Sequence, residues 1–279
     1  MIWAVTQGAA AFPSFRPHPE VDLILLAAGV GYWWVTSRKV QATRRHKLFF
    51  AGGLLVLWVF ASWPIHDVGE DLLYSVHMGQ HTVFAYVAPP LLLLGCPPDL
   101  IRWLVRNPVL GYCCRTFARP LVAIVLFNIE GIALHVPAVV NRATTNGPLH
   151  FFVHLVLFLV ALCLWFPVIS QVDGLPRLRH GPKLLYLMAA SFLPVVPVAF
   201  LALAPGPVYS HYAAAPRLFS SFDVINDQQA AAGVMWLVSS FWMTGTILVV
   251  FLDWWRLSQK DEATASYPAH LRRPAGASR

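Results

Sequence analysis

Apolar residues gather in seven stretches along the chain, and polar or charged residues fill the segments between them. A helix needs ~20 mostly apolar residues to cross ~30 Å of hydrocarbon, and each stretch is close to that length. The stretches lie at approximately 21–36, 47–63, 72–94, 120–141, 149–170, 183–204 and 230–252. Pro89 and Pro90 interrupt the third, and Pro194 and Pro197 the sixth; such prolines are expected to kink a spanning helix rather than break it. The pattern predicts an all-α fold, a polytopic membrane protein with a seven-transmembrane-helix bundle.

Composition agrees with this class and excludes others. Of the 279 residues, 57% are hydrophobic and 12% are charged, which is too apolar for a disordered chain. Four cysteines are too few for a disulfide-stabilised secreted module. We divide the chain into a short outer N-terminal tail (1–20), the transmembrane domain (21–255) and a flexible cytoplasmic tail (256–279) that is polar and rich in proline and alanine.

The 20 Lys and Arg residues set the expected orientation. Seventeen lie in alternate connecting segments and in the C-terminal tail, whereas Arg16, Arg142 and Arg217 lie on the opposite side. Because cytoplasmic loops carry the excess of basic residues, we expect the N-terminus outside and the C-terminus in the cytoplasm. The net charge of +7 is then a signal of topology that also favours contact with anionic membrane lipid, and not with nucleic acid.

Histidines gather on the outer side of this topology. Eight of the 11 lie outside or in the outer half of the membrane: His18, His66, His77, His81, His135, His150, His154 and His211. At ~1.5 Å per helical residue, side chains from four different helices reach a similar depth. These are His77, His135, His154 and Met235, and a deeper layer contains His81 and Glu130.

Imidazole and thioether groups at one depth are typical of a copper site. Two His-x-x-x-His pairs, at 77/81 and 150/154, each place both rings on one face of a helix. A single intramembrane histidine is more often a hydrogen-bonded packing residue, and a methionine is more often a core residue, so the prediction depends on the whole set. The candidate metal ligands are His77, His81, His135, His154, His150, His66, Met235 and Met78.

Within this set, we expect copper from the outer face to be held by three imidazoles, with one thioether as a soft axial ligand. The imidazoles are those of His77, His135 and His154, and the thioether is that of Met235 or Met78. Two other functions use the same residues. Histidine pairs from different helices could be axial ligands of haem in a membrane cytochrome. A copper or proton transporter is disfavoured because the inner halves of the stretches are almost free of ionisable residues.

Polar residues beside the ligands are expected to tune the site or relay protons. They are Glu130, Asn128 and Asp227. Glu130 either orients His81 or is a protonated acid that only packs. Asn128 either takes part in the site or bridges two helices by a hydrogen bond. Asp227 is expected to cap the outer end of the seventh helix and to orient His66 or His211.

Six motifs cover the third to seventh stretches. They are Y-S-V-H-M-G-Q-H at 74–81, A-P-P-L-L-L-L-G at 88–95, N-I-E-G-I at 128–132 followed by His135 and Pro137, H-F-F-V-H at 150–154, W-F-P-V-I at 165–169 and D-Q-Q-A-A-A-G-V-M-W at 227–236. As a set they resemble the multi-spanning CtaG-type cytochrome c oxidase assembly factors, a family associated with caa-type oxidases. The last motif departs slightly, with alanines where the family has more glycine.

The resemblance implies a non-enzymatic, multi-pass protein of the cell (inner or cytoplasmic) membrane. Such a protein helps a haem-copper oxidase of the respiratory chain to mature, as a chaperone for copper delivery or insertion. The implied partners are the oxidase subunits and a copper donor protein on the outer face. A hydrolase is not expected, because the chain has no H-E-x-x-H or G-x-S-x-G motif.

Overall fold

The computed structural model describes residues 11–192 and 194–265, and all regular elements among them are helical. The longer helices are α1 (Pro19–Arg38), α2 (Arg44–Ala61), α8 (Pro120–Ala133), α10 (Gly147–Ile169), α11 (His180–Phe192) and α14 (Val224–Ala265). A continuous run is formed by α4 (Tyr74–Thr82), the π-helical segment η1 (Val83–Val87) and α5 (Ala88–Gly95). The remaining helices are α3 (Ile65–Asp71), α6 (Pro98–Leu104), α7 (Pro108–Phe117), α9 (Pro137–Ala143), α12 (Val195–Leu203) and α13 (Ser210–Ala214).

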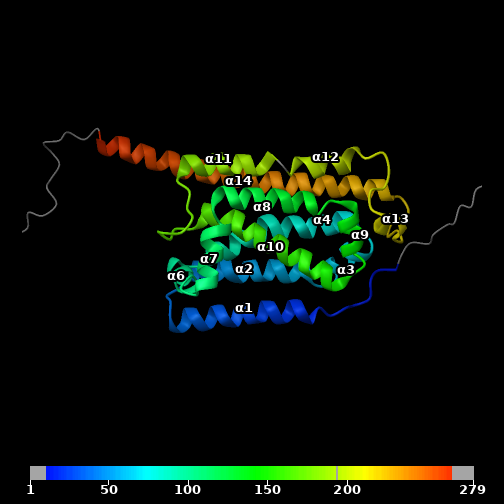
Figure 1. Cartoon of the computed structure of the whole chain (residues 1–279), viewed down its shortest axis with the longest axis horizontal. Coiled ribbons are helices and arrows are strands. Elements are labelled where there is room, and N and C mark those ends of the chain that lie inside the picture. Colours follow the sequence, from blue (N-terminus) through cyan, green and yellow to red (C-terminus); the bar gives the residue numbers. More distant parts are fainter. Residues whose placement is uncertain (1–10, 193, 266–279) are drawn as a thin grey trace, which may run out of the picture.

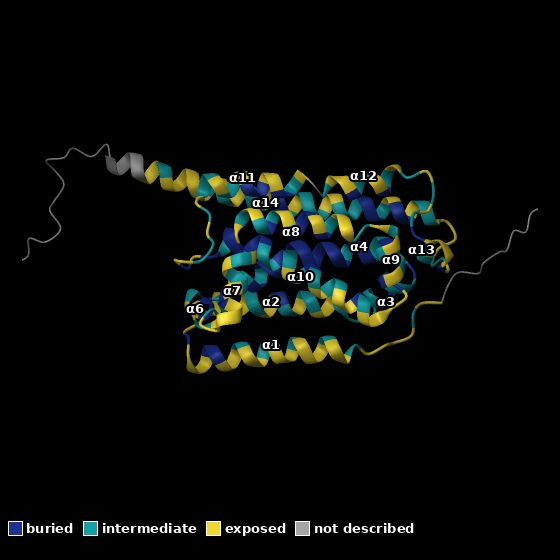
Figure 2. Cartoon of the chain, viewed as in Figure 1, coloured by how far each residue is buried: buried dark blue, intermediate teal, exposed yellow. Residues whose placement is uncertain are grey.

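The long helices run side by side along the longest axis of the molecule (Figure 1). The run from α4 to α5 lies in the middle, where α4 packs on α14 and α5 packs on α2 and α10. α1 forms one edge against α2, and its outward face carries exposed apolar side chains such as Leu23 and Trp33. Figure 2 shows this contrast, with α1 mostly exposed and the middle of the bundle around α4 buried. Apolar side chains on the outside are the arrangement that a lipid environment stabilises.

Three helices are long and apolar enough to cross a membrane: Gly147–Ile169, His180–Leu203 and Val224–Lys260. Three further pairs pass the same test together but bend at a short break: α2 with α3 by 41°, α4–α5 with α6 by 97°, and α7 with α8 by 81°. The described residues therefore hold three to six candidate spans. α1, which covers the first predicted stretch, is not among them, so the count of seven spans and their orientation stay predictions.

Pro89 and Pro90 change the hydrogen-bonding pattern of the α4–α5 run without ending the helix. Pro89 has no N–H to donate to the carbonyl of Ala85, four residues earlier. The indole Nε1 of Trp165 on α10 donates to that carbonyl at 2.9 Å. The π-helical segment just before Ala88 and the hydrogen bond from Trp165 let the helix continue to Gly95. Near Pro194, α11 is described as far as Phe192 and α12 from Val195, and the two together form the candidate span His180–Leu203.

Two boundaries differ from those predicted. The stretch at 120–141 is not one helix, because α8 ends at Ala133 and α9 begins at Pro137. Val136, just before this proline, takes an extended backbone conformation with ψ 125°, as the proline ring favours. The predicted tail from Arg256 is helical as far as Ala265, because neither glycine nor proline occurs before Pro268. The rest of that tail, at 266–279, lies outside the described residues.

Candidate metal centre

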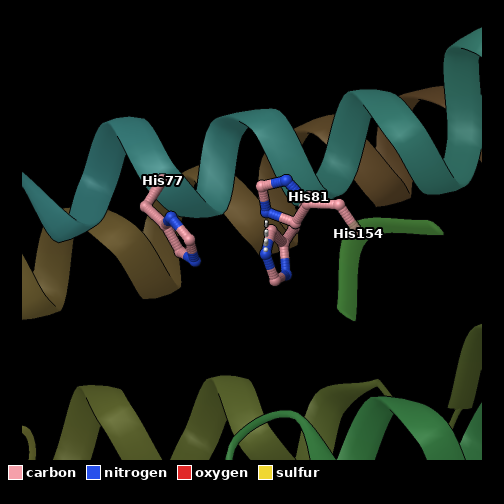
Figure 3. A group of neighbouring side chains, drawn as sticks. All are labelled: His77, His81 and His154. Atoms are coloured by element: carbon pink, nitrogen blue, oxygen red, sulfur yellow. Dashed lines mark hydrogen bonds between the residues drawn. The ribbon is translucent and has the colours of Figure 1, made fainter. Parts of the chain in front are cut away.

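Two of the candidate histidines lie on α4, whose start is fixed by a side chain from the far end of the chain. The carboxylate of Asp227, on α14, accepts hydrogen bonds from the backbone N–H groups of Tyr74 (2.8 Å) and Ser75 (3.0 Å). An acceptor and a negative charge at this position satisfy the free N–H groups of the first turn. His77 and His81 follow one turn apart, point to the same side of α4 and are buried (Figure 3).

The second pair lies near the start of α10. The side chain of Asn146 caps this helix by accepting from the N–H of Leu149 at 3.0 Å. The Nε2 atom of His154 lies 3.1 Å from Nε2 of His150 and 3.0 Å from Nε2 of His81 (Figure 3 shows the latter contact). Each such N–N contact requires one nitrogen that donates and one that accepts. The three rings therefore cannot all carry a proton on the nitrogens that are in contact.

His77, His81 and His154 form a group, here called the imidazole triad, whose ligand atoms all lie within 4.8 Å of one another. All three residues are buried or nearly so. Imidazole nitrogens so close to one another cannot all be protonated, because burial and mutual repulsion disfavour the charged rings. Neutral imidazole is the form that binds transition metals.

A second group lies beside the triad and consists of His66, Glu70 and His150, whose ligand atoms also lie within 4.8 Å of one another. Glu70 Oε1 accepts from His150 Nδ1 at 2.7 Å, and Glu70 Oε2 lies 3.5 Å from His66 Nε2. His66 Nδ1 also lies 3.2 Å from the amide nitrogen of Gln80. A carboxylate on the far nitrogen of an imidazole fixes its tautomer and raises its basicity toward a metal.

The close packing of α3 on α4 places Glu70 beside His66 and His150. A Cβ atom on Gly69 would lie 2.8 Å from Gln80 Oε1 and 3.0 Å from the backbone nitrogen of His77, so only glycine lets α3 approach α4 this closely. Tyr212 on α13 donates to the carbonyl of Gly69 at 2.9 Å. Burial, with the nearby carboxylate of Glu70, raises the pKa of Tyr212 well above its ordinary value, so its hydroxyl stays a donor. His211 Nε2 lies 2.8 Å from the carbonyl of Glu70 and fixes the same turn.

His135 does not belong to the imidazole triad, and the expectation that it shares a copper site with His77 and His154 stays a prediction. Its Nδ1 donates to the carbonyl of Gly131 at 2.6 Å, and the residue lines a pocket of about 70 Å³ next to the triad. Glu130 and Asn128 line the same pocket, together with Met78 and Met235. His81, which the sequence placed in a deeper layer with Glu130, is a member of the triad and lines this pocket too.

Asp227 also differs from its predicted role. It caps α4 and not its own helix, where Asp223 Oδ1 instead accepts from the N–H of Asn226 at 2.8 Å. It does not orient an outer histidine, because His66 contacts Glu70 and Gln80 and the ring of His211 contacts the Glu70 carbonyl. Glu70 and Gln80 contact the histidines but are not among the residues that the sequence singled out as ligands or their partners. The His66-x-x-x-Glu70 spacing, and a glutamine inside the histidine motif, are the signals in the sequence that point to them.

The centre is open on one side. His66, Glu70, His150 and His154 line one end of a groove of about 670 Å³ between α1, α2 and α10. Apart from His18 and Glu20, the rest of its wall is mainly apolar and includes Leu54, Leu57 and Phe158. A cation or a partner side chain could therefore reach the imidazoles between the helices.

Comparison with known proteins places this arrangement in a family. No curated protein and no solved structure matches the chain. A family model described as Cytochrome c oxidase caa3 assembly factor (Caa3_CtaG) matches residues 27–257. The match spans α2 to α13 and most of α1 and α14, and so contains every residue of both histidine groups. It confirms the resemblance seen in the motifs, and because it covers most of the chain, this protein belongs to the family of cytochrome c oxidase caa3 assembly factors.

Proposed function

We propose that this protein carries copper as cargo at the imidazole triad and passes it to a haem-copper oxidase during assembly in the cell membrane. The observation that carries the proposal is the convergence of His77, His81 and His154, three buried imidazoles within 4.8 Å from two helices. Three buried imidazoles in a bilayer protein are costly and are more often functional than incidental.

The donor set fits copper. Imidazole nitrogens lie ~2 Å from a bound transition-metal ion, so two of them around one ion lie up to ~4 Å apart. The 3.0 Å between the Nε2 atoms of His81 and His154 falls within that limit, and small ring rotations would open space for an ion. Imidazole binds both Cu(I) and Cu(II), and it also binds zinc. Membership of an oxidase assembly family favours copper over zinc.

The surroundings support a carrier that releases its ion. The ligands include no thiolate, which would hold Cu(I) more tightly. The groove between α1, α2 and α10 gives a partner lateral access to His150 and His154. The predicted orientation, in which 17 of the 20 basic residues lie on the cytoplasmic side, supports a centre at the outer face. There a copper donor protein would load it, and an oxidase subunit would receive the ion.

The contact between His81 and His154 argues against the haem alternative. Two axial imidazole nitrogens of one haem lie roughly 4 Å apart on opposite sides of the porphyrin. Here the two Nε2 atoms are 3.0 Å apart, and Nε2 of His150 lies 3.1 Å from that of His154. His154 contacts both other rings, so neither pair leaves a plane between its nitrogens for a porphyrin.

Metal analysis of the purified protein tests the proposal. Wild-type protein loaded with Cu(I) under reducing conditions is compared with His77→Ala/His154→Ala and with a control, His46→Ala/His180→Ala, whose histidines lie far from the triad. We expect the triad variant to lose one copper per chain and the control to keep it. Equal copper in the two double variants would overturn the proposal. Normal copper content of the oxidase in cells lacking this protein would contradict the delivery role.

A further inference from the structure

The pocket next to the triad has features that the triad does not explain. It lies between α4, α8, α12 and α14 and has a volume of about 70 Å³. Its walls are mainly apolar, and the lining residues with metal-binding or polar side chains include Met78, His81, Asn128, Glu130, His135 and Met235. A water molecule takes up ~30 Å³ in the liquid, so the pocket is large enough for an ion or one to two waters.

Four buried polar atoms at this pocket have no hydrogen-bond partner among the described residues. They are both carboxylate oxygens of Glu130, Oδ1 of Asn128 and Nε2 of His135. Glu130 is 8% exposed. A buried carboxyl group without a partner is strongly destabilising, and several unpartnered polar atoms around one cavity indicate that something else pairs with them.

The hydrogen bond of His135 determines which of its nitrogens is free. Nδ1 can pair with the carbonyl of Gly131, at 2.6 Å, only by donating a proton. In the neutral ring, Nε2 then carries a lone pair, and this atom is buried and unpartnered. A backbone carbonyl on one nitrogen with the other left free is the usual arrangement of a metal-binding histidine.

From this geometry we propose a second copper site, for Cu(I), formed by His135 and the thioethers of Met78 and Met235, with Glu130 as the compensating charge. Thioether sulfur is a soft ligand that favours Cu(I) over harder cations, and Met78 is almost fully buried at 1% exposure. One monovalent cation beside one carboxylate leaves the pocket with no net charge, which lowers the cost of burying both.

His81 connects this pocket to the triad. It belongs to the triad and also lines the pocket, so one imidazole borders both sites. An ion could move between them by exchanging ligands at His81 without entering water. The inference deepens the proposed function and rests on it for the identity of the metal, but the pocket would exist without the triad.

The methionine methyl groups give a direct test. The full-length protein is labelled with ¹³C at its five methionine methyls, its cysteines are alkylated, and it is titrated with Ag(I), a monovalent probe for Cu(I). We expect the resonances of Met78 and Met235 to shift with the bound ion and that of Met243 to stay. Met243 is a matched control, because it is buried on the same helix as Met235 and does not line the pocket. Unchanged Met78 and Met235 signals would overturn the proposal.

Copper stoichiometry separates the two sites. Wild-type protein should bind two Cu(I) per chain, and Met78→Leu/Met235→Leu should bind one, since a change from methionine to leucine nearly conserves volume and keeps the fold. The triad variant His77→Ala/His154→Ala should also bind one and keep the Ag(I)-induced methyl shifts. If the triad variant keeps both ions while the methyls still shift, the proposed function fails and the pocket survives. One Cu(I) in both wild type and Met78→Leu/Met235→Leu would refute the pocket.

Discussion

The Nε2 atoms of His81 and His154 lie 3.0 Å apart, although the residues are separated by 73 positions in the chain. One comes from α4 and the other from α10, so their contact depends on how the bundle brings these two helices together. Glu70 reaches the same centre from α3 through His150, whose Nε2 lies 3.1 Å from that of His154. Any change that moves one of these helices is therefore expected to alter the metal centre.

The first prediction concerns Glu70→Gln. The amide keeps the size of the side chain but removes the charge that pairs with His150 Nδ1 at 2.7 Å. Loss of a partner that orients a metal-binding imidazole directly typically lowers affinity by ~10- to 100-fold. Glu70 acts one step further away, through His150 on the triad residue His154, so we expect Cu(I) affinity, measured by competition with a coloured chelator, to fall by about 10-fold, the lower end of that range. Glu20→Gln is the control, since Glu20 is half exposed and lies outside both groups; equal affinities of the two variants would contradict the role given to Glu70.

The second prediction concerns Asp227→Ala, which removes both acceptors of the α4 start. The N–H groups of Tyr74 and Ser75 lose bonds of 2.8 and 3.0 Å. Loss of an N-terminal cap costs ~0.5–2 kcal/mol, and burial at this site places the expected loss at the upper end. Thermal unfolding in detergent measures it. Asp223→Ala removes the exposed cap of α14 and should cost clearly less; a larger loss for this control would refute the assigned role of Asp227.

The third prediction concerns the close contact of α5 with α2. A Cβ atom on Gly95 would lie 2.6 Å from the backbone nitrogen of Phe50, which cannot move without moving α2. Gly95→Ala is therefore expected to lower stability by ~1–3 kcal/mol. Gly52→Ala on α2, with nothing within 4 Å of the added atom, should be neutral or slightly stabilising. Denaturant titration in detergent compares them, and a stable Gly95→Ala protein would show that the helices can separate freely.

Much of the helical framework could be predicted from hydropathy, because apolar runs in a bilayer protein can satisfy their backbone groups only as helices. α2, the α4–α5 run and α10 each coincide with a predicted stretch to within a few residues, and α14 contains the seventh stretch but extends beyond it at both ends. The i,i+4 spacing of His77 and His81, and of His150 and His154, correctly placed each pair on one helix face. These are local properties, and a local pattern is enough to establish them.

The composition of the metal centre depends on contacts between segments far apart in the chain, which no local pattern contains. The order of helices around the bundle places His81 beside His154, and it places His135 at a pocket that His81 also lines. Pro137 was visible in the sequence, but prolines in spanning helices can either kink or end them, and here the helix ends. In the sequence, Glu70 is one of several acidic residues in a polar segment. Only the packing of α3 against α4 places it beside the histidines.

The last prediction tests the π-helical segment at the middle of the bundle. Trp165→Phe keeps an aromatic ring but removes the Nε1–H that donates to the Ala85 carbonyl at 2.9 Å. Because Pro89 has no N–H, that buried carbonyl would lose its donor, at a cost of ~1–3 kcal/mol. We expect a lower unfolding temperature with unchanged copper stoichiometry, since Trp165 belongs to neither histidine group. Trp236→Phe is the control, because Trp236 is 55% exposed and its loss should be small. Equal unfolding temperatures for the two variants would mean that the carbonyl of Ala85 finds another donor and that η1 does not depend on α10.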